Sequence, residues 1–371
     1  MSSIAHGRHW AVAGGGTGGH VTPALALSER IVARGDVVLV LGTERGIETA
    51  LVPEAGFELV ALPSGQIMGQ GAWARVRSIF AIAQGCVSAW RTLRSQRCEI
   101  VVSVGGYASV PAVLAGVALR RPIALVEPNA RPGRANRVLA RFAQRIFVQF
   151  DEAGQALARG DARVRCPGIP LRRALVEAFA NAPPRRAPEP PYHLLVVGGS
   201  QGARQINEAM MEAAGALQRI PLRVVHQTGH DDRERVAHAY AAAGLDAEVL
   251  AFERNMPRRY READFALCRA GALTVAELAM AGLPALLVPY PHAADDHQAA
   301  NAAALAEAGA ARVLPSRPLT SEHVVAAIEA LLAAPELLRS MGDAAAKLAR
   351  PDAADRIVEA CAELLGPAGR A

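Results

Sequence analysis

The feature that most constrains the fold is a glycine-rich turn that occurs twice, each time between an apolar run and a helix-like segment. Residues 14–20 read GGGTGGH after the apolar run 10–13, and residues 198–203 read GGSQGA after the apolar run 194–197. Glycines allow a backbone to approach a bulky anion, and the first turn of the next helix presents unpaired N–H groups. The repetition predicts two related nucleotide-fold domains that face one cleft, with each turn a candidate diphosphate cradle.

Short apolar runs alternate with amphipathic stretches of helical length along all 371 residues, which predicts an α/β protein with parallel sheets. A content of 51% hydrophobic and 20% charged residues suits many buried strands. The predicted strands cover residues 10–13, 37–41, 100–104, 123–126, 146–148, 194–197, 222–226, 265–268 and 285–288. We place an N-terminal domain at residues 1–166, a C-terminal domain at 167–351, and a last helix within 352–371 that packs back on the first domain.

The positive charge is concentrated in the N-terminal half. Residues 1–165 carry 19 arginines against 11 acidic residues, whereas the remainder carries 21 basic and 24 acidic residues. Such an excess suits a polyphosphate ligand or an anionic membrane surface, and nucleic acid ranks last because no solid basic run with interleaved aromatics occurs. Five scattered cysteines without C-x-x-C indicate a reducing cytoplasm, and residues 1–10 lack the apolar core of a signal peptide.

One segment imitates a membrane span, because residues 100–119 contain no charge over twenty positions. Gly105-Gly106 and Pro111 divide it into a strand, a glycine turn and a helix from about Ser109. We therefore interpret this segment as another strand-turn-helix unit of the soluble core.

The first turn also satisfies the G-x-G-x-x-G fingerprint of dinucleotide-binding domains, so a dehydrogenase is the first rival. That fingerprint requires an acid at the end of the second strand to hold the ribose hydroxyls. Here Asp36 stands at the start of that strand and Leu41-Gly42 at its end, so the expected acid is missing. Hydride chemistry is therefore disfavoured.

Three candidate positions in the first half follow strands that should end at one edge of the sheet. His20 closes the first turn, where a general base would meet a substrate; the alternative is a capping or core histidine. Tyr107 lies in a second glycine turn, and Glu127 and Asn129 follow the next strand. Because open α/β sheets bind ligands beyond their strand carboxyl ends, we expect these residues on one rim, although ordinary loop chemistry is an open alternative.

In the second half, residues 268–277 end a strand and open a helix. The N–H groups of Ala272, Leu273 and Thr274 should point at a phosphate, and Glu277, placed on the first helical turn, could bind paired ribose hydroxyls with its two oxygens. The polar cluster at residues 291–301 suits sugar hydroxyls, or it caps a helix that starts near Asp295.

Motifs of metal sites are missing from the sequence, which has no D-x-D, H-E-x-x-H or G-K-[ST]. His226 and His230 are four residues apart, but Thr228-Gly229 between them argues against a helical metal pair. We therefore predict neither a metal nor another cofactor.

Together these motifs resemble the MurG family of bacterial glycosyltransferases, which add N-acetylglucosamine to lipid I. The resemblance spans nearly the whole chain, with its motifs in the family's order and spacing. The matching segments are residues 14–20, 103–107, 198–203, 226–229, 271–277 and 296–301. The resemblance implies a GT-B fold of two Rossmann-like domains around a central cleft, UDP-N-acetylglucosamine as donor, lipid I as acceptor and lipid II as product.

The resemblance also implies roles for single residues. It places Thr17, Gly18, Gly19 and Asn129 on the N-terminal side of the cleft and Arg172 against the donor. The UDP-sugar site is completed by Ser200, Ala272, Leu273, Thr274, Val275, Ala276, Glu277 and Gln298. A uracil contact made by the main chain falls at Glu253, where the family commonly has isoleucine. The chain departs from the family again at Val126, Pro128 and His297, so Glu127 and Asn129 must suffice near the acceptor.

The implied reaction is an inverting single displacement with His20 as the base and Glu127 as the second candidate. Helix N-termini and Arg172 would stabilise the departing diphosphate. A sugar-nucleotide 2-epimerase of the same architecture is the main alternative, and a non-catalytic sugar-nucleotide sensor is the third. The oligomeric state is left open by the sequence.

A lipid-linked acceptor requires the enzyme to reach a membrane, which implies a peripheral location on the cytoplasmic face of the bacterial inner membrane. Residues 73–94 mix arginines such as Arg75 and Arg77 with aromatics, which suits an anionic interface. A plain amphipathic helix packed on the first sheet is the alternative interpretation.

Overall fold

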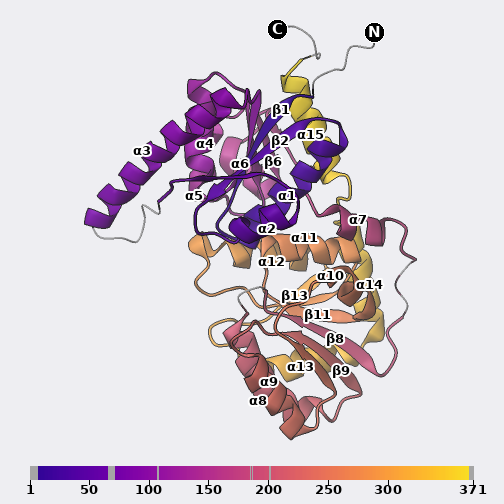
Figure 1. Ribbon diagram of the computed structural model, residues 1–371. Helices are drawn as coiled ribbons and strands as arrows, with labels where there is room; N and C mark the ends of the chain where they lie inside the picture. The colour runs from indigo at the N-terminus through magenta and orange to yellow at the C-terminus, as the bar shows by residue number, and fades with distance from the viewer. Residues whose placement is uncertain are drawn as a thin grey trace. The chain divides into compact units, whose positions relative to one another are not determined.

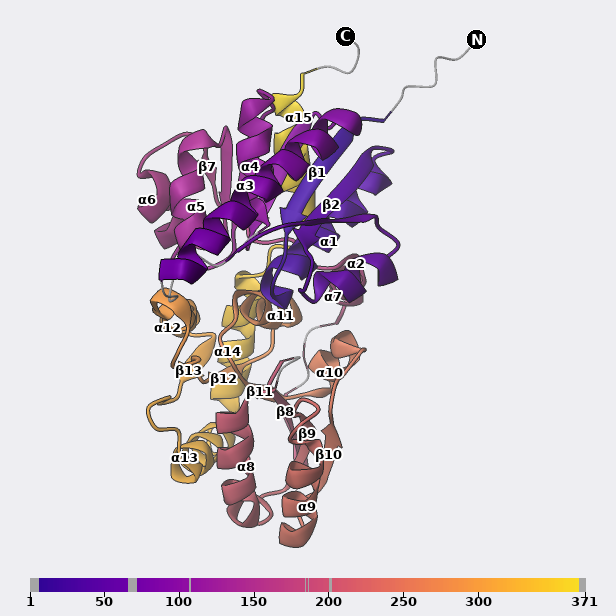
Figure 2. The ribbon, with the colours of Figure 1, turned by 60° about the vertical axis from the view of Figure 1, so that its left-hand side comes forward.

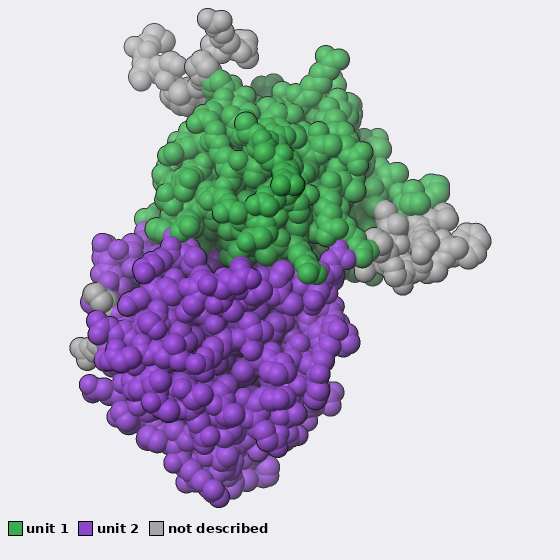
Figure 3. Space-filling model, turned by 180° about the vertical axis from the view of Figure 1, so that it is seen from behind, with its two compact units in different colours: residues 1–173, 350–371 green, residues 174–349 purple. Residues whose placement is uncertain are grey.

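The chain folds into two compact units, seen here in a computed structural model that describes residues 7–65, 72–106, 108–183, 185, 187–199 and 202–366. Unit 1 comprises residues 1–173 and 350–371, and unit 2 comprises residues 174–349 (Figure 3). The division falls at residue 173, seven residues after the boundary expected from the sequence.

Unit 1 contains a seven-stranded parallel sheet in the order β3-β2-β1-β4-β5-β6-β7. Its strands are β1 (His9–Gly14), β2 (Val37–Thr43), β3 (Leu59–Leu62), β4 (Ile100–Gly105), β5 (Ile123–Glu127), β6 (Arg145–Val148) and β7 (Val164–Arg165). Its helices are α1 (Gly18–Ala33), α2 (Glu48–Glu54), α3 (Ala72–Ser95), α4 (Ser109–Ala118), α5 (Arg134–Leu139), the 3-10 helix η1 (Ala140–Phe142), α6 (Asp151–Ala158) and α15 (Ala353–Leu364). Helices α3 and α4 cover one face of the sheet, and α1 and α15 lie on the other (Figures 1 and 2).

Unit 2 contains a six-stranded parallel sheet in the order β10-β9-β8-β11-β12-β13. Its strands are β8 (Tyr192–Val197), β9 (Leu222–Gln227), β10 (Ala247–Leu250), β11 (Phe265–Cys268), β12 (Ala285–Leu287) and β13 (Ala311–Val313). Its helices are α7 (Arg173–Ala180), which begins at the unit boundary, α8 (Arg204–Leu217), α9 (Arg233–Ala243), α10 (Met256–Glu262), α11 (Ala272–Ala281), the 3-10 helix η2 (Ala294–Asp296), α12 (His297–Glu307), α13 (Ser321–Leu332) and α14 (Pro335–Lys347).

The two sheets share one topology. Counted within each unit, the first six strands have the order 3-2-1-4-5-6, and β7 extends the sheet of unit 1 by one strand. The direction of winding reverses between β1 and β4 in unit 1 and between β8 and β11 in unit 2. Open sheets of this type bind ligands at the carboxyl ends of these two strands. The topology therefore points to the loops after β1 and β4 and the loops after β8 and β11.

All nine strands predicted from the sequence are present, with ends that differ by one or two residues. They are the interior strands, and their continuous apolar runs are buried, as in β4 and β11. The prediction missed β3, β7, β10 and β13, which lie toward the sheet edges and are largely half-buried or exposed. Such strands lack the apolar run on which the prediction depended.

The uncharged segment 100–119 forms β4 and α4, as predicted. No helix in the described part of the chain is both long and apolar enough to cross a membrane. The last helix, α15, packs on α1 and β6 within unit 1, where Asp355 pairs with Arg30 and Glu363 lies near Arg145 and Arg165.

Candidate active site

The loops after β1 and β4 meet at the switch point of unit 1 and hold His20 between them. His20 is the third residue of α1, and its Nδ1 lies 3.2 Å from the Thr17 hydroxyl. A Cβ at Gly105 would lie 2.9 Å from the His20 ring, and a Cβ at Gly106 would lie 2.2 Å from the Gly15 carbonyl oxygen. Both Gly105 and Gly106 have positive φ, so these positions require glycine for conformation as well as for space. Tyr107 lies outside the described residues.

The first glycine turn encloses a carboxylate of the protein itself. Glu48, the buried first residue of α2, accepts hydrogen bonds from the Gly16 N–H at 3.1 and 3.0 Å and from the Thr43 N–H at 2.9 Å. A Cβ at Gly15 would lie 2.4 Å from Glu48 Oε1, and a Cβ at Gly46 would lie 1.9 Å from Oε2. Several glycines around this turn therefore make room for Glu48.

This arrangement corrects two expectations. The first turn is not an open diphosphate cradle at Gly16, because Glu48 already occupies that amide. The expected absence of an acid after the second strand is also wrong, since β2 continues to Thr43, Glu44 follows it and Glu48 reaches back to the turn. Burial alone would raise the pKa of Glu48, but the bonds from Thr43 and Gly16 outweigh it and hold the pKa below its ordinary value. The open anion-binding groups that this turn offers are the N–H groups of Gly18 and Gly19 in the first turn of α1.

Glu127 holds the loop after β5 in place. Its Oε1 accepts from the Asn129 N–H at 3.0 Å and the Asn129 side-chain amide at 3.2 Å, and its Oε2 accepts from the Gly133 N–H and the Asn136 amide, both at 2.9 Å. Burial outweighs these bonds and raises the pKa of Glu127. With four donors on its two oxygens, Glu127 is arranged to orient Asn129.

Arg172 lies in unit 1 and is paired with α1. Its Nε donates to Glu29 Oε1 at 2.6 Å, while the Arg173 N–H donates to Oε2 of the same carboxylate at 3.1 Å. The side chain of Arg172 is partly exposed, and the pair with Glu29 engages only the Nε edge of the guanidinium.

The second glycine turn, at the switch point of unit 2, differs from the first. A Cβ at Gly202 would lie 2.2 Å from the Thr228 carbonyl oxygen, so this turn packs on the loop after β9. In the described part of the turn the hydrogen bonds are made to backbone carbonyls, from Gly198 to Gln227 and from Gly202 to Gly199, and no side chain caps α8. Ser200 falls outside the described residues.

A buried network supports that loop. His226 Nδ1 lies 2.7 Å from the Tyr240 hydroxyl and its Nε2 lies 3.1 Å from Asn207 Oδ1, while the Asn207 amide donates to the Thr228 carbonyl at 3.0 Å and to Asp232 at 2.8 Å. Burial lowers the pKa of His226 to about 3, so the ring stays neutral and holds the Thr228 loop through Asn207.

The N-terminus of α11 forms the other side of this switch point. Gly271 is its N-cap residue, no described side chain caps it, and Ala272, Leu273 and Thr274 are its first three residues. The first intrahelical hydrogen bond runs from the Val275 N–H to the Gly271 carbonyl, so the N–H groups of these three residues have no partner within the helix. The predicted site residues Val275 and Ala276 continue the helix, which positions an amide-rich turn as expected from the sequence.

Glu277 is the sixth residue of α11, so it lies on the second helical turn and not on the first, as the sequence interpretation had placed it. Its Oε2 accepts a hydrogen bond of 2.8 Å from the Tyr260 hydroxyl of α10. Burial raises the pKa of Glu277 to about 7. The expected ribose contact therefore shares the carboxylate with Tyr260, a partner 17 positions away that sequence reasoning missed.

Gln298 and Glu253 are both tied to their surroundings. Gln298, the second residue of α12, accepts from the Tyr290 N–H at 2.9 Å through Oε1, so its carbonyl oxygen is engaged with the protein. The Glu253 carboxylate accepts from Arg259 Nε at 2.5 Å and from the Asn255 N–H at 2.7 Å. These bonds fold the Glu253 side chain back onto the protein and leave its main chain as the group that can meet a base.

The helix predicted to start near Asp295 begins at His297, after η2. Asn301 on this helix donates to the Ala270 carbonyl at 3.1 Å and thereby fixes the loop that precedes α11. Arg269 in that loop donates to Gln205 Oε1 at 3.1 Å and stacks on Tyr290 at 5.4 Å. Sequence reasoning missed Arg269 and Gln205 because their interaction spans 64 positions.

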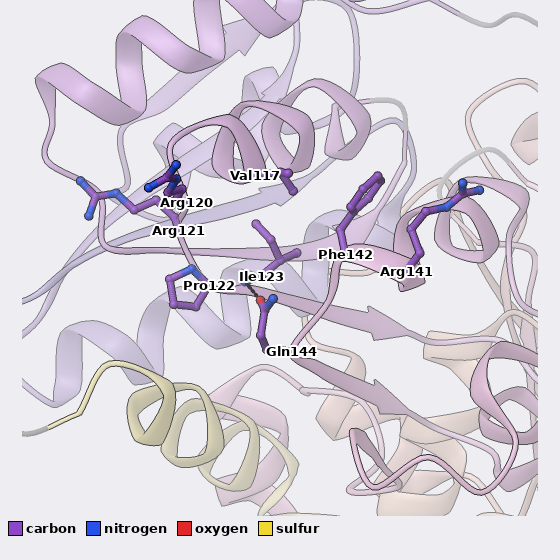
Figure 4. Close-up of a pocket in the computed structure, with 8 residues that line it drawn as sticks. All are labelled: Val117, Arg120, Arg121, Pro122, Ile123, Arg141, Phe142 and Gln144. Atoms are coloured by element: carbon purple, nitrogen blue, oxygen red, sulfur yellow. Dashed lines mark hydrogen bonds between the residues drawn. The ribbon is translucent and has the colours of Figure 1, made fainter.

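A cavity of about 510 Å³ lies elsewhere in unit 1, between the end of α4, the start of β5 and η1 (Figure 4). Arg120, Arg121 and Arg141 line it together with Phe142, and it contains none of the predicted site residues. Among the described residues, no cluster of three or more histidine, cysteine or acidic side chains could hold a metal ion.

The chain matches known proteins along most of its length. The model of the glycosyltransferase family 28 N-terminal domain matches residues 10–148, and that of the family 28 C-terminal domain matches residues 193–357. The chain is 41% identical to a Geobacter metallireducens protein over 352 residues, which cover 94% of this chain and 96% of the relative. It is 43% identical to an Anaeromyxobacter protein over 368 residues, covering 97% and 95%. Both are named UDP-N-acetylglucosamine–N-acetylmuramyl-(pentapeptide) pyrophosphoryl-undecaprenol N-acetylglucosamine transferase.

Among solved structures, the crystal structure of Acinetobacter baumannii MurG is similar, with a TM-score of 0.78, 32% identity and coverage of 96% of this chain and 99% of that chain. A UDP-N-acetylglucosamine 2-epimerase structure has a TM-score of 0.68 with 14% identity, covering 96% and 95%. The second likeness shows a shared fold alone. The two Rossmann-like parallel sheets and the MurG likeness confirm the predicted GT-B class.

Proposed function

The chain belongs to glycosyltransferase family 28, and from this premise we propose how its residues carry out the reaction for which its relatives are named. It transfers N-acetylglucosamine from UDP-N-acetylglucosamine to the muramyl sugar of pyrophosphoryl-undecaprenol-linked muramyl-pentapeptide, lipid I, and so forms lipid II. The observation that carries the assignment of the donor is the open turn of unit 2. There the α11 N-terminus, the second glycine turn and Glu277 supply the donors and the acceptor that a diphosphate and a ribose need.

In this proposal unit 2 binds the donor. The amides of Ala272, Leu273 and Thr274, with Ser200 in the glycine turn, hold the diphosphate, and Glu277 accepts from the ribose hydroxyls. Gln298 donates to the sugar, and the main chain at Glu253 reads the uracil. Val275 and Ala276 hold the start of α11 in the conformation that these contacts require.

Unit 1 serves the acceptor. His20 takes the proton of the attacking acceptor hydroxyl, because it closes the turn at the switch point with its ring against Gly105. Glu127 orients Asn129 instead of acting as the base, since four N–H donors already occupy its oxygens. Thr17 sets the His20 ring, and the N–H groups of Gly18 and Gly19 face the acceptor.

The transfer is a single displacement. The acceptor oxygen forms a bond to the anomeric carbon of the donor sugar while the bond from that carbon to the diphosphate oxygen breaks, and the hydroxyl proton passes to His20. The electron pair of the broken bond leaves with UDP, whose charge is stabilised by the helix N-terminus and by the outer nitrogens of Arg172. Inversion follows from attack on the face opposite the leaving group.

We further propose that α3 docks on the membrane that holds the undecaprenyl chain. Its buried positions carry Ser78, Gly85, Ala89 and Leu93, whereas its outward positions carry Phe80, which is 68% exposed, and Ile79, which is 56% exposed. A helix that served only to cover the sheet would carry polar side chains at these outward positions. Trp90, Val87 and several arginines continue this exposed face, with Arg94 stacked over Trp90 at 5.4 Å. The side chains of Trp73 and Arg75 lie outside the description.

The docked orientation corresponds to a peripheral protein on the cytoplasmic face of the inner membrane, with anionic lipids as partners of the α3 arginines. Arg120 and Arg121 follow α4, the helix that packs against α3, and add positive charge to unit 1.

Transfer of labelled N-acetylglucosamine to a short-chain lipid I analogue tests the whole proposal. We expect label in a lipid II product only when donor and acceptor are both present. Conversion of the donor alone into another UDP-sugar would instead establish an epimerase, and binding of donor without turnover would establish a sensor.

A further inference from the structure

The buried residue Tyr260 donates a hydrogen bond to Glu277 and has no part in the reaction scheme above. Tyr260 lies on α10, is 1% exposed, and donates to Glu277 Oε2 on α11 at 2.8 Å. We propose that Tyr260 is a positioning residue for the donor, which fixes the Glu277 carboxylate so that its remaining acceptor capacity faces the ribose hydroxyls. This inference rests on the proposed donor role of Glu277.

The position of Tyr260 is set from both sides. Asn255 caps α10 by accepting from the Arg258 N–H, which anchors the short helix at its start. Arg185 donates to the Tyr260 carbonyl oxygen at 3.0 Å and to the Ala281 carbonyl, at the end of α11, at 3.2 Å. The same arginine thus joins the ends of the two helices whose side chains form the Tyr260–Glu277 bond, so the bond joins two elements that are already fixed.

The direction of this hydrogen bond is set while Glu277 is ionised. Burial, with Glu277 close by, raises the pKa of the Tyr260 phenol well above its ordinary value, so the hydroxyl keeps its proton and donates to the ionised carboxylate. A donor on Oε2 restrains the side-chain torsions of Glu277 and leaves Oε1 as the principal acceptor for a ligand. A flexible carboxylate would have to be ordered by the ligand, at a cost to affinity.

The charge state of Glu277 depends on few neighbours. Helices α10, α12 and α14 pack against α11, and β11 precedes it. From these elements the titratable groups that interact with Glu277 are Tyr260 and Cys268, and burial raises the pKa of the Cys268 thiol to about 12, so both are neutral near pH 7. Burial raises the pKa of Glu277 and the Tyr260 bond opposes that rise. Removal of the hydroxyl therefore moves the titration of Glu277 further upward.

The test compares Tyr260→Phe with wild type in uridine diphosphate binding and in transfer, from pH 6 to 9. At pH 7 we expect KM for the donor to rise about tenfold, as the loss of a charge-assisted bond implies, with kcat within about twofold. KM rises as the pH falls and Glu277 becomes protonated, and in the variant this rise begins at a higher pH. The difference in KM between the two proteins should therefore be smallest at pH 9, where the carboxylate is ionised in both. A KM for the donor equal to that of wild type at every pH would contradict a positioning role.

Two controls separate this effect from general damage. Tyr192→Phe removes the hydroxyl of another buried tyrosine, at the amino end of β8 and away from the switch point, and should leave KM unchanged. In a Glu277→Gln background Tyr260→Phe should add little, since residues that act through one another are not additive. This cycle also serves if Tyr260→Phe lowers the melting temperature, because a purely structural loss would persist in the double variant and overturn the inference.

Calorimetry with uridine diphosphate and 2′-deoxyuridine diphosphate separates the inference from the proposed function. We expect wild type to prefer the ribose form and Tyr260→Phe to lose that preference. If wild type shows the preference but transfers no sugar to the lipid acceptor, the proposed reaction fails and the role of Tyr260 stands. If wild type shows no preference, the ribose contact of Glu277 and the inference fail together.

Discussion

The two glycine turns occupy equivalent places in two sheets of one topology, yet only the first, among the described residues, binds a carboxylate of the protein itself. In unit 1 the Gly16 N–H is taken by the buried Glu48 carboxylate. In unit 2 the described part of the turn makes only backbone bonds, and the neighbouring α11 N-terminus has no side-chain cap. The difference teaches that a glycine-rich turn can be built around an anion that the protein itself supplies, so the motif alone does not identify a ligand site.

The comparison implies that the two units have different functions in the reaction. The His20→Ala variant tests this, and its expected effect is the largest of those predicted. If unit 1 supplies the base and unit 2 holds the donor, kcat should fall by about two to four orders of magnitude while donor affinity stays unchanged. Steady-state transfer and calorimetry with uridine diphosphate measure the two quantities. A kcat within a few-fold of wild type would remove His20 as the base, and a parallel loss of donor affinity would break the division of work.

The closure of the first turn predicts a coupling between Glu48 and a glycine. Gly46→Ala should lower the stability of unit 1 strongly in wild type, because the new Cβ would lie 1.9 Å from Glu48 Oε2. Glu48→Ala should itself cost about 1–3 kcal/mol, since it removes the buried carboxylate that accepts from the Gly16 and Thr43 N–H groups. In the Glu48→Ala background Gly46→Ala should add almost nothing. Melting temperatures from calorimetry provide the measurement.

Gly106→Ala is the matched control for this cycle. Its Cβ would lie 2.2 Å from the Gly15 carbonyl oxygen and its φ is positive, so it should destabilise the protein equally with and without Glu48. Additive losses for Gly46→Ala and Glu48→Ala would mean that the glycines of this turn do not serve the carboxylate. Because the folded pKa of Glu48 is lowered, its stabilising contribution is present above the ordinary carboxyl pKa and is lost as the pH falls through the folded value.

Donor binding by unit 2 should depend on pH near neutrality, because Glu277 on α11 titrates there. Glu277 has a pKa raised to about 7, and protonation removes a charged acceptor for the ribose hydroxyls. Affinity for uridine diphosphate should therefore weaken about tenfold from pH 9 to pH 6, as expected for one group that must be ionised. Glu277→Gln should bind more weakly at high pH but with a flat profile. A wild-type affinity that is constant across this range would show that Glu277 does not take part.

How much the sequence could predict depends on how far apart along the chain the interacting residues are. Interior strands and the turns after them carry local signals, and these placed His20, Glu127 and the α11 N-terminus at the carboxyl ends of strands, where the structure has them, while their roles stay predictions. Glu48 could not be found, because its partner Gly16 is 32 residues away and the glycines around it suggest a ligand. Tyr260 likewise reaches Glu277 from another helix. The periodicity of α3 was visible, but only the structure shows that Phe80 and Ile79 are among its exposed positions.

The units also differ in their surfaces, and this difference leads to the smallest predicted effect. On α3 of unit 1, four large apolar side chains are exposed on one helix, whereas in the described part of unit 2 they are scattered singly at Phe252, Tyr290 and Val313. Phe80→Ser should weaken sedimentation with anionic vesicles about fivefold, since the ring loses contact with the acyl boundary. Val37→Ser, at an exposed position of β2, is the matched control and should have no effect. Equal binding of all three proteins, or binding that ignores anionic lipid, would mean that α3 is only a cover for the sheet and that the units differ in their turns alone.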